Sequence, residues 1–152
     1  MRPARKAFVG FGVSSLAAMP ILGRRTVRLT DLIRVFLGAG IGGVLRYWAG
    51  GWIADRSSAS FPWHTFAINI AGAFAIGALM GLSVERGLGS SNLRLFLGVG
   101  ILGGFTTFST LSYESLALLE SGLWAQGLSN MFGSVVAGLA AAAVGLLVGR
   151  AV

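Results

Sequence analysis

Four long apolar runs constrain the fold of this chain more than any other feature of its sequence. Each run has the length that a helix needs to cross a bilayer, which is about 20 apolar residues. The connections between the runs are short, so successive helices become antiparallel neighbours. The runs cover residues 32–54, 62–84, 93–119 and 123–149. The sequence therefore predicts an all-α integral membrane protein with four transmembrane helices in each subunit.

The composition agrees with a multi-pass protein of the plasma or inner membrane, because 55% of the residues are hydrophobic and only 11% are charged. A net charge of +7 would suggest nucleic acid as the partner of a soluble protein. Half of the basic residues, however, precede the first apolar run, where they face lipid headgroups. These are Arg2, Arg5, Lys6, Arg24, Arg25 and Arg28. We therefore expect the lipid membrane, and no nucleic acid, as a partner.

Residues 1–30 form a basic N-terminal extension, and residues 31–152 form the predicted membrane domain. The extension begins with RPARK and continues with AFVGFGVSSLAAMPILG, which is similar to the charged and apolar regions of a signal peptide. Pro20 and the pair Arg24-Arg25 interrupt the apolar part. Two interpretations stay open: a targeting or cleaved segment, and a disordered or interfacial extension.

The third apolar run contains the stretch GGFTTFSTLSYE at 103–114, which carries five hydroxyl groups besides its tyrosine. Two adjacent glycines followed by β-branched threonines have poor helix propensity. The sequence therefore predicts that the third helix is broken at Gly103–Thr110. Irregular backbone within a membrane is tolerated where it is buried in protein or lines a wet cavity, and its freed carbonyls can hold a cation.

Three blocks of the sequence resemble the signature blocks of the Fluc (CrcB-type) fluoride channels, in the order and spacing of that family. They are GAGIGGVLRYW at 38–48, WHTFAINIAGAFAIG at 63–77 and GGFTTFSTLSYE at 103–114. The resemblance covers about residues 33–150 and leaves the N-terminal extension outside. It implies a passive, fluoride-selective channel that lets fluoride leave the cell and so reduces its toxicity in the cytoplasm.

The resemblance also implies an antiparallel, dual-topology dimer with two fluoride pores and a structural sodium ion (Na⁺) at the centre of its interface. By position, the backbone carbonyls of Gly103 and Thr106 would hold this ion, and carbonyl oxygens suit a hard cation. Arginine counts near the ends of the runs favour a cytoplasmic N-terminus, whereas a dual-topology homodimer prefers balanced charge. A homodimer and a pair of homologous subunits therefore both stay open.

The predicted pore offers weak hydrogen-bond donors to the anion. Asn69 carries an amide NH₂ and Ser134 a hydroxyl, while the ring of Phe108 presents a positive edge to a small anion. The sequence departs from the family's TTFSTF pattern, because Leu111 stands at the second phenylalanine. Leu111 either forms an apolar wall of the path or packs in the core.

Five other residues complete the predicted path. Thr110 and Ser112 belong to the hydroxyl-rich stretch, and Glu114 is an ionisable residue in a spanning helix, which is a functional candidate near one end of the pore. Asn130 lies on one stripe of the fourth helix with Ser134 and Gly138. Arg46 either draws fluoride into a vestibule or anchors the helix to lipid phosphate. His64, at the start of the second run, is interpreted as an interfacial residue.

Two other classes of function compete with the channel. An enzyme is disfavoured, because the chain has one histidine and no cysteine, and no nucleophile has a recognisable base. A small dual-topology, proton-coupled exporter of drugs or cations is the alternative. That mechanism requires an acid within the membrane, typically in the first helix, where only Asp31 and Asp55 flank the run.

Overall fold

The computed structural model describes residues 27–85 and 91–152, and all regular structure in these two ranges is helical. The elements are α2 (Leu29–Ala54), α3 (Trp63–Glu85), α4 (Ser91–Arg94), η1 (Leu95–Leu102, with π-helical hydrogen bonding), α5 (Gly103–Phe105), α6 (Phe108–Glu120) and α7 (Trp124–Ala151). Residues 1–26 of the predicted extension lie outside the described part of the chain. The prediction of an all-helical protein is confirmed for the part of the chain that is described.

Three stretches are helical, long and apolar enough to cross a membrane: Trp63–Ser83, Asn92–Glu120 and Trp124–Ala151. The sequence predicted four, and the remaining one corresponds to α2. This helix has 26 residues, but six of them are glycine, and it also contains Asp31, Arg34 and Arg46. These residues lower the mean hydropathy of α2 without shortening it.

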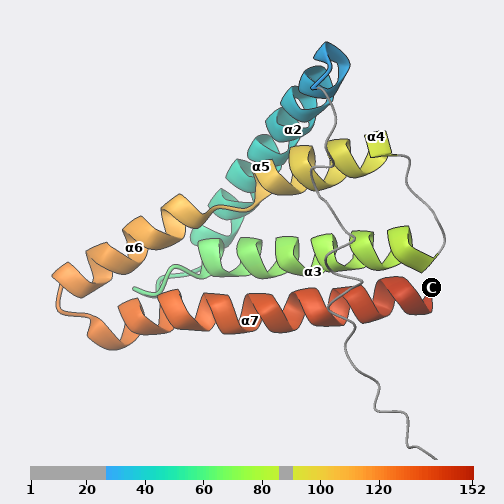
Figure 1. Cartoon of the computed structure of the whole chain (residues 1–152). Helices are drawn as coiled ribbons and strands as arrows, with labels where there is room; N and C mark the ends of the chain where they lie inside the picture. Colours follow the sequence, from blue (N-terminus) through green and yellow to red (C-terminus); the bar gives the residue numbers. More distant parts are fainter. Residues whose placement is uncertain (1–26, 86–90) are drawn as a thin grey trace, which may run out of the picture.

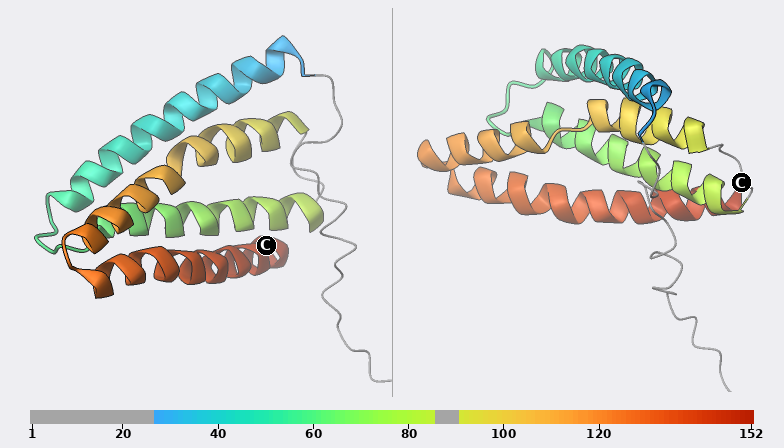
Figure 2. Two further views of the ribbon diagram at one scale, coloured as in Figure 1. Left: turned by 60° about the vertical axis from the view of Figure 1, so that its left-hand side comes forward. Right: turned by 45° about the horizontal axis from the view of Figure 1, so that its top comes forward.

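The helices α3 and α7 form the most extensive packed pair, and they run parallel side by side (Figures 1 and 2). Glycines on both helices make the close approach possible. A Cβ atom on Gly77 would collide with the carbonyl of Ala142, and a Cβ atom on Gly145 would collide with the carbonyl of Phe74. In lipid, where apolar helices gain no hydrophobic drive from association, such close contact supplies dispersion energy instead.

The chain from α4 to α6 changes its neighbour halfway (Figure 1). The first part, η1 and α5, packs against α2, whereas α6 packs against α7. The change occurs at Thr106 and Thr107, whose backbones are extended, with ψ of 159° and 116°. This interruption lies inside the stretch for which the sequence predicted a break, and it decides where the polar side chains gather.

Candidate functional site

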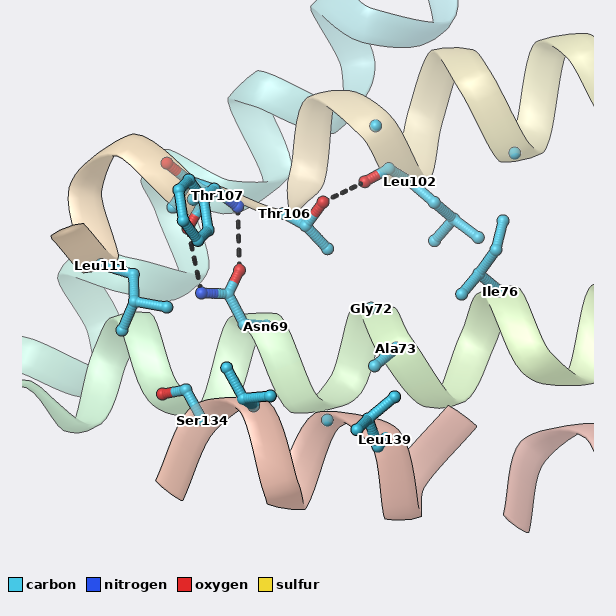
Figure 3. A pocket seen from close by; sticks show the side chains of 15 residues that line it. Asn69, Gly72, Ala73, Ile76, Leu102, Thr106, Thr107, Leu111, Ser134 and Leu139 are labelled. Atoms are coloured by element: carbon cyan, nitrogen blue, oxygen red, sulfur yellow. Dashed lines mark hydrogen bonds between the residues drawn. The ribbon is translucent and has the colours of Figure 1, made fainter. Parts of the chain in front are cut away.

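The side chain of Asn69 on α3 holds the interruption between α5 and α6 (Figure 3). Its Nδ2 donates to the carbonyl of Thr107 at 3.0 Å, and its Oδ1 accepts from the Thr107 N–H at 2.8 Å. One amide side chain thus satisfies both backbone groups of an extended residue. An unpaired backbone group away from water would be costly, so Asn69 makes the irregular backbone tolerable.

The two threonines at the interruption close the adjoining helix ends. Thr106 Oγ1 donates to the Leu102 carbonyl at 3.0 Å, which accepts the Thr106 N–H as well. Thr107 is the N-cap of α6, because its Oγ1 accepts from the Thr110 N–H at 3.3 Å and donates to Thr110 Oγ1 at 2.9 Å. Both helix ends are therefore stabilised by side chains of the residues between them.

Arg46 reaches the same place from α2. Its Nη1 donates to the carbonyl of Thr106 at 3.3 Å, and the side chain is partly buried. A full positive charge therefore lies beside the carbonyls of the interruption. Arg46 was predicted to face either an anion or lipid phosphate, and in the structure it binds the protein backbone.

A cavity of about 520 Å³ lies next to the interruption (Figure 3). Its lining combines apolar side chains with the polar groups of Asn69, Thr106, Thr107 and Ser134. Phe108 and Leu111 also line it, but their exposure differs: Phe108 is 79% exposed and Leu111 only 7%. Gly103 and Gly138 complete the predicted residues found here.

Two polar residues of α7 are buried with one unpartnered atom each. Ser134 lines the cavity and is 6% exposed, and its Oγ has no hydrogen-bond partner. Asn130 is fully buried and donates to Ser115 Oγ on α6 at 3.0 Å, while its Oδ1 has no partner. Asn130 and Ser134 are one turn apart on α7, and Asn130 contacts α6 rather than the cavity.

Glu114 belongs to a second polar group, at the end of the molecule where α3 begins. Its Oε1 accepts from Thr65 Oγ1 at 2.8 Å and lies 3.0 Å from His64 Nε2. Its Oε2 is buried without a partner. A second cavity of about 350 Å³ adjoins this group. Glu114 is therefore separated from the Asn69 group, although both lie between α3 and α6.

The remaining predicted residues have local roles in the structure. Ser112 is exposed, and its Oγ donates to the Phe108 carbonyl one turn earlier at 2.9 Å. Thr110 is exposed and takes part in the N-cap of α6. Such back-bonding satisfies a hydroxyl within its own helix, so neither side chain needs a partner from another element.

Sequence reasoning did not assign roles to Thr65 and Thr107. Thr65 is four residues before Asn69, so both lie on one face of α3, and this spacing would have placed Thr65 opposite α6. Thr107 precedes Phe108-Ser109-Thr110, and a threonine just before a helix is a common N-cap. The contact between His64 and Glu114 could not be predicted from the sequence pattern, because the two residues are 50 positions apart in the chain.

A cluster of three or more His, Cys, Asp or Glu side chains does not occur among residues 27–85 and 91–152. Backbone carbonyls are the other oxygen donors that a cation can use. In a continuous helix the Gly103 carbonyl would pair with the Thr107 N–H, which donates to Asn69 instead. The interruption thus removes the helical donor of that carbonyl.

The chain matches a family described as CrcB-like protein, Camphor Resistance (CrcB), over residues 33–146. The chain also aligns with curated relatives named fluoride-specific ion channel FluC, over almost the whole length of each relative. One from Chloroflexus aurantiacus is 46% identical over 122 residues, which are 80% of this chain and 97% of the relative. One from Thermus thermophilus is 49% identical over 117 residues, which are 77% of this chain and 91% of the relative. One from a Methylobacterium species is 50% identical over 122 residues, which are 80% of this chain and 98% of the relative.

Proposed function

The chain belongs to the CrcB-like family, and from this premise we propose that it is a fluoride-specific ion channel. It is a multi-pass protein of the cell membrane and not an enzyme. As a passive channel, it lets fluoride leave the cell and so limits fluoride toxicity in the cytoplasm. The relatives carry the name of this function, and the cavity between the interruption and α7 has the chemistry that it needs.

The observation that carries the proposal is the set of neutral donors on an otherwise apolar cavity. The Ser134 hydroxyl is buried there without a partner, and the Asn69 NH₂ uses one of its two hydrogens for Thr107. The ring edge of Phe108 adds a weak positive potential. Such groups replace part of the hydration shell of fluoride without a full charge, so the anion can leave again.

We further propose four membrane crossings. α2 has 26 residues, enough to span the hydrocarbon layer despite its glycines. The segment Asn92–Glu120 makes one crossing that is interrupted at Thr106 and Thr107. Extended backbone within a membrane requires partners from the protein, and Asn69 and Arg46 supply them.

The working unit in this proposal is an antiparallel dimer, formed by two copies or by two homologous subunits. Phe108 lines the cavity but is 79% exposed in a single chain. A ring that must touch a dehydrated ion needs a wall on its other side. A second subunit over this face encloses the cavity, which gives one pore for each subunit by symmetry.

A structural sodium ion fits the donor set in part. The carbonyls of Gly103 and Thr106 would hold it, and Gly103 has lost its helical donor. The Thr106 carbonyl already accepts from Arg46 Nη1, so it offers one remaining lone pair close to a positive charge. Two carbonyls are too few for a hard cation, and a second subunit would supply two more. Such an ion would tie together the two interrupted helices.

The proton-coupled exporter is not favoured. The part of α2 between Asp31 and Asp55 contains no acid that could exchange a proton for a cationic substrate. The relatives are named fluoride channels, and no relative named above is named an exporter.

The test is efflux from liposomes that contain the purified full-length protein, measured with a fluoride electrode and, in matched vesicles, with a chloride electrode. We expect rapid fluoride efflux and chloride efflux no faster than in protein-free vesicles. Equal efflux of the two anions would refute fluoride selectivity, and no fluoride efflux from folded protein would refute the channel.

A further inference from the structure

The group formed by His64, Thr65 and Glu114 has a geometry that the fluoride path as described does not use. All hydrogen bonding to the carboxylate converges on one oxygen, since Thr65 Oγ1 and His64 Nε2 both approach Oε1, at 2.8 and 3.0 Å. The other oxygen, Oε2, is buried and unpartnered. The two oxygens of this carboxylate therefore have very different surroundings.

The group borders the second cavity, and both this cavity and the one beside the interruption are lined by residues of α3 and α6. On α3, Asn69 lines the first cavity and His64 the second; on α6, Leu111 lines the first and Glu114 the second. These pairs are five and three residues apart, which corresponds to about 5–8 Å along a helix axis. An anion that travelled from the first cavity along α3 and α6 toward the start of α3 would pass close to the Glu114 carboxylate.

The charge of this group depends on the imidazole. An ionised Glu114 beside a neutral His64 gives the pair one negative charge, which repels an anion nearby. With protonated His64 the pair is neutral overall, and the hydrogen bond to Oε1 becomes a stronger, charge-assisted one. Histidine is the side chain that ordinarily changes charge between about pH 5 and 8. The side chain of His64 is 36% exposed, and it belongs to the second residue of α3, close to the end of that helix.

Few titratable side chains other than His64 and Glu114 lie close enough to the second cavity to change its charge. Tyr113 is the third titratable residue that lines the second cavity. Asp55, Arg56 and Glu120 lie at the same end of the described chain but do not line it. The guanidinium of Arg56 is held by the Trp52 carbonyl at 2.9 Å and stacks on the Trp52 ring at 4.1 Å.

We propose that His64 is a positioning residue for Glu114, and that its protonation balances the charge of the carboxylate and opens the second cavity to fluoride. This inference rests on the proposed fluoride channel. It assigns the proton-dependent step to one side chain, because the chain contains a single histidine.

The experiment measures fluoride efflux from liposomes at equal internal and external pH, between about pH 6 and 8, the range in which histidine titrates. Protein-free vesicles at each pH correct for leakage of hydrogen fluoride. We expect wild-type flux to be at least about threefold higher at the acidic end, because removal of a net negative charge beside the path lowers the repulsion of the anion.

Two substitutions fix the charge of the pair in opposite states. His64→Gln keeps a hydrogen-bond donor without a charge, and it should give a flat profile at the low, alkaline level of wild type. His64→Lys keeps a positive charge throughout this range, and it should give a flat profile at the high, acidic level. Tyr113→Phe removes the other titratable group of the cavity wall and should retain the wild-type slope.

The outcomes separate this inference from the proposed function. Fluoride flux that does not vary with pH in wild type, or a wild-type slope that persists in whichever His64 variant folds, would refute the role of His64 and leave the channel intact. The absence of fluoride flux at every pH would refute the channel itself. Size-exclusion chromatography establishes that each variant is folded.

Discussion

At the scale of single residues, the candidate site separates groups that face the ion from groups that hold the backbone. Phe108 and Ser134 present unengaged surfaces to the cavity, whereas Thr107 and Arg46 have partners in the backbone of the interruption. Substitution of the first kind should change flux, and substitution of the second kind should change stability first.

Phe108→Ile tests the first kind. The substitution keeps apolar volume but removes the positive ring edge, and a side chain that is 79% exposed contributes little to folding of the single chain. We expect fluoride flux to fall at least about tenfold, which corresponds to about 1.4 kcal/mol. Phe36→Ile is the matched control, since Phe36 is 77% exposed on α2 and does not line the cavity. Wild-type flux from folded Phe108→Ile protein would exclude the ring from the path.

Leu111→Phe restores the aromatic residue of the family pattern at a position that lines the same cavity. The side chain is only 7% exposed, but the cavity of about 520 Å³ offers room for the larger ring. We expect fluoride flux to be retained within a factor of about three, well below a tenfold change of about 1.4 kcal/mol. A loss of folded protein on size-exclusion chromatography would show instead that Leu111 packs in a filled core.

At the scale of elements, two features decide how the helices fit together. One is the close approach of α3 and α7 through glycines, and the other is the amide of Asn69 on α3 that replaces missing helical bonds between α5 and α6. Each has a substitution that disturbs it selectively.

Asn69→Leu keeps the size of the side chain and leaves both backbone groups of Thr107 without their partner. Each buried polar group left unsatisfied costs about 1–3 kcal/mol, so we expect the free energy of unfolding in detergent to fall by about 2–5 kcal/mol. Ser112→Ala is the control, because that exposed hydroxyl bonds only within its own helix, and it should change stability by less than about 0.5 kcal/mol. Equal stability of the two variants would contradict the role of Asn69.

Gly145→Ala places a Cβ atom against the carbonyl of Phe74 on α3. The two helices must then separate, and overpacking of this kind costs about 1–3 kcal/mol. Gly138→Ala on the same helix meets nothing within 4 Å, and the higher helix propensity of alanine should stabilise it by up to about 1 kcal/mol. Thermal unfolding in detergent compares the two, and a Gly145→Ala protein as stable as Gly138→Ala would show that α3 and α7 are not in close contact.

At the scale of the whole molecule, the two ends differ in chemistry. The start of α2, the start of α4 and the end of α7 lie at one end (Figures 1 and 2). This end carries Arg28, Arg34, Arg94 and Arg150. The opposite end carries Arg56 and all four tryptophans of the chain, Trp48, Trp52, Trp63 and Trp124. The basic extension precedes the first end in the sequence, so the positive-inside rule favours the cytoplasm for that end.

Single-cysteine labelling tests this orientation, because the chain has no native cysteine. We expect a membrane-impermeant thiol reagent to label Ser58→Cys from outside the cell and to leave Val152→Cys unlabelled. A chain that begins at Thr30 behind a new methionine should keep fluoride flux, because the extension lies outside the family match, but its orientation should become mixed. Equal labelling of both positions in the full chain would contradict a single orientation; a single orientation would favour a homologous partner of opposite orientation.

The sequence alone was sufficient for the helical class, the positions of the apolar segments and the resemblance to fluoride channels. Apolar length, glycine spacing and the low helix propensity of GGFTT act locally, so they can be assessed one segment at a time. The tertiary structure decided three contacts between residues far apart in the chain. Asn69 hydrogen-bonds Thr107, 38 residues away, and Arg46 donates to the Thr106 carbonyl, 60 residues away. His64 lies against Glu114, 50 residues away. A hydrogen bond between helices forms only within a narrow range of distance and angle. This geometry depends on how closely the glycines let the helices approach. It also depends on the point between α5 and α6 at which the third segment stops packing against α2 and starts packing against α7. No single segment contains that information, because it arises when the helices pack together.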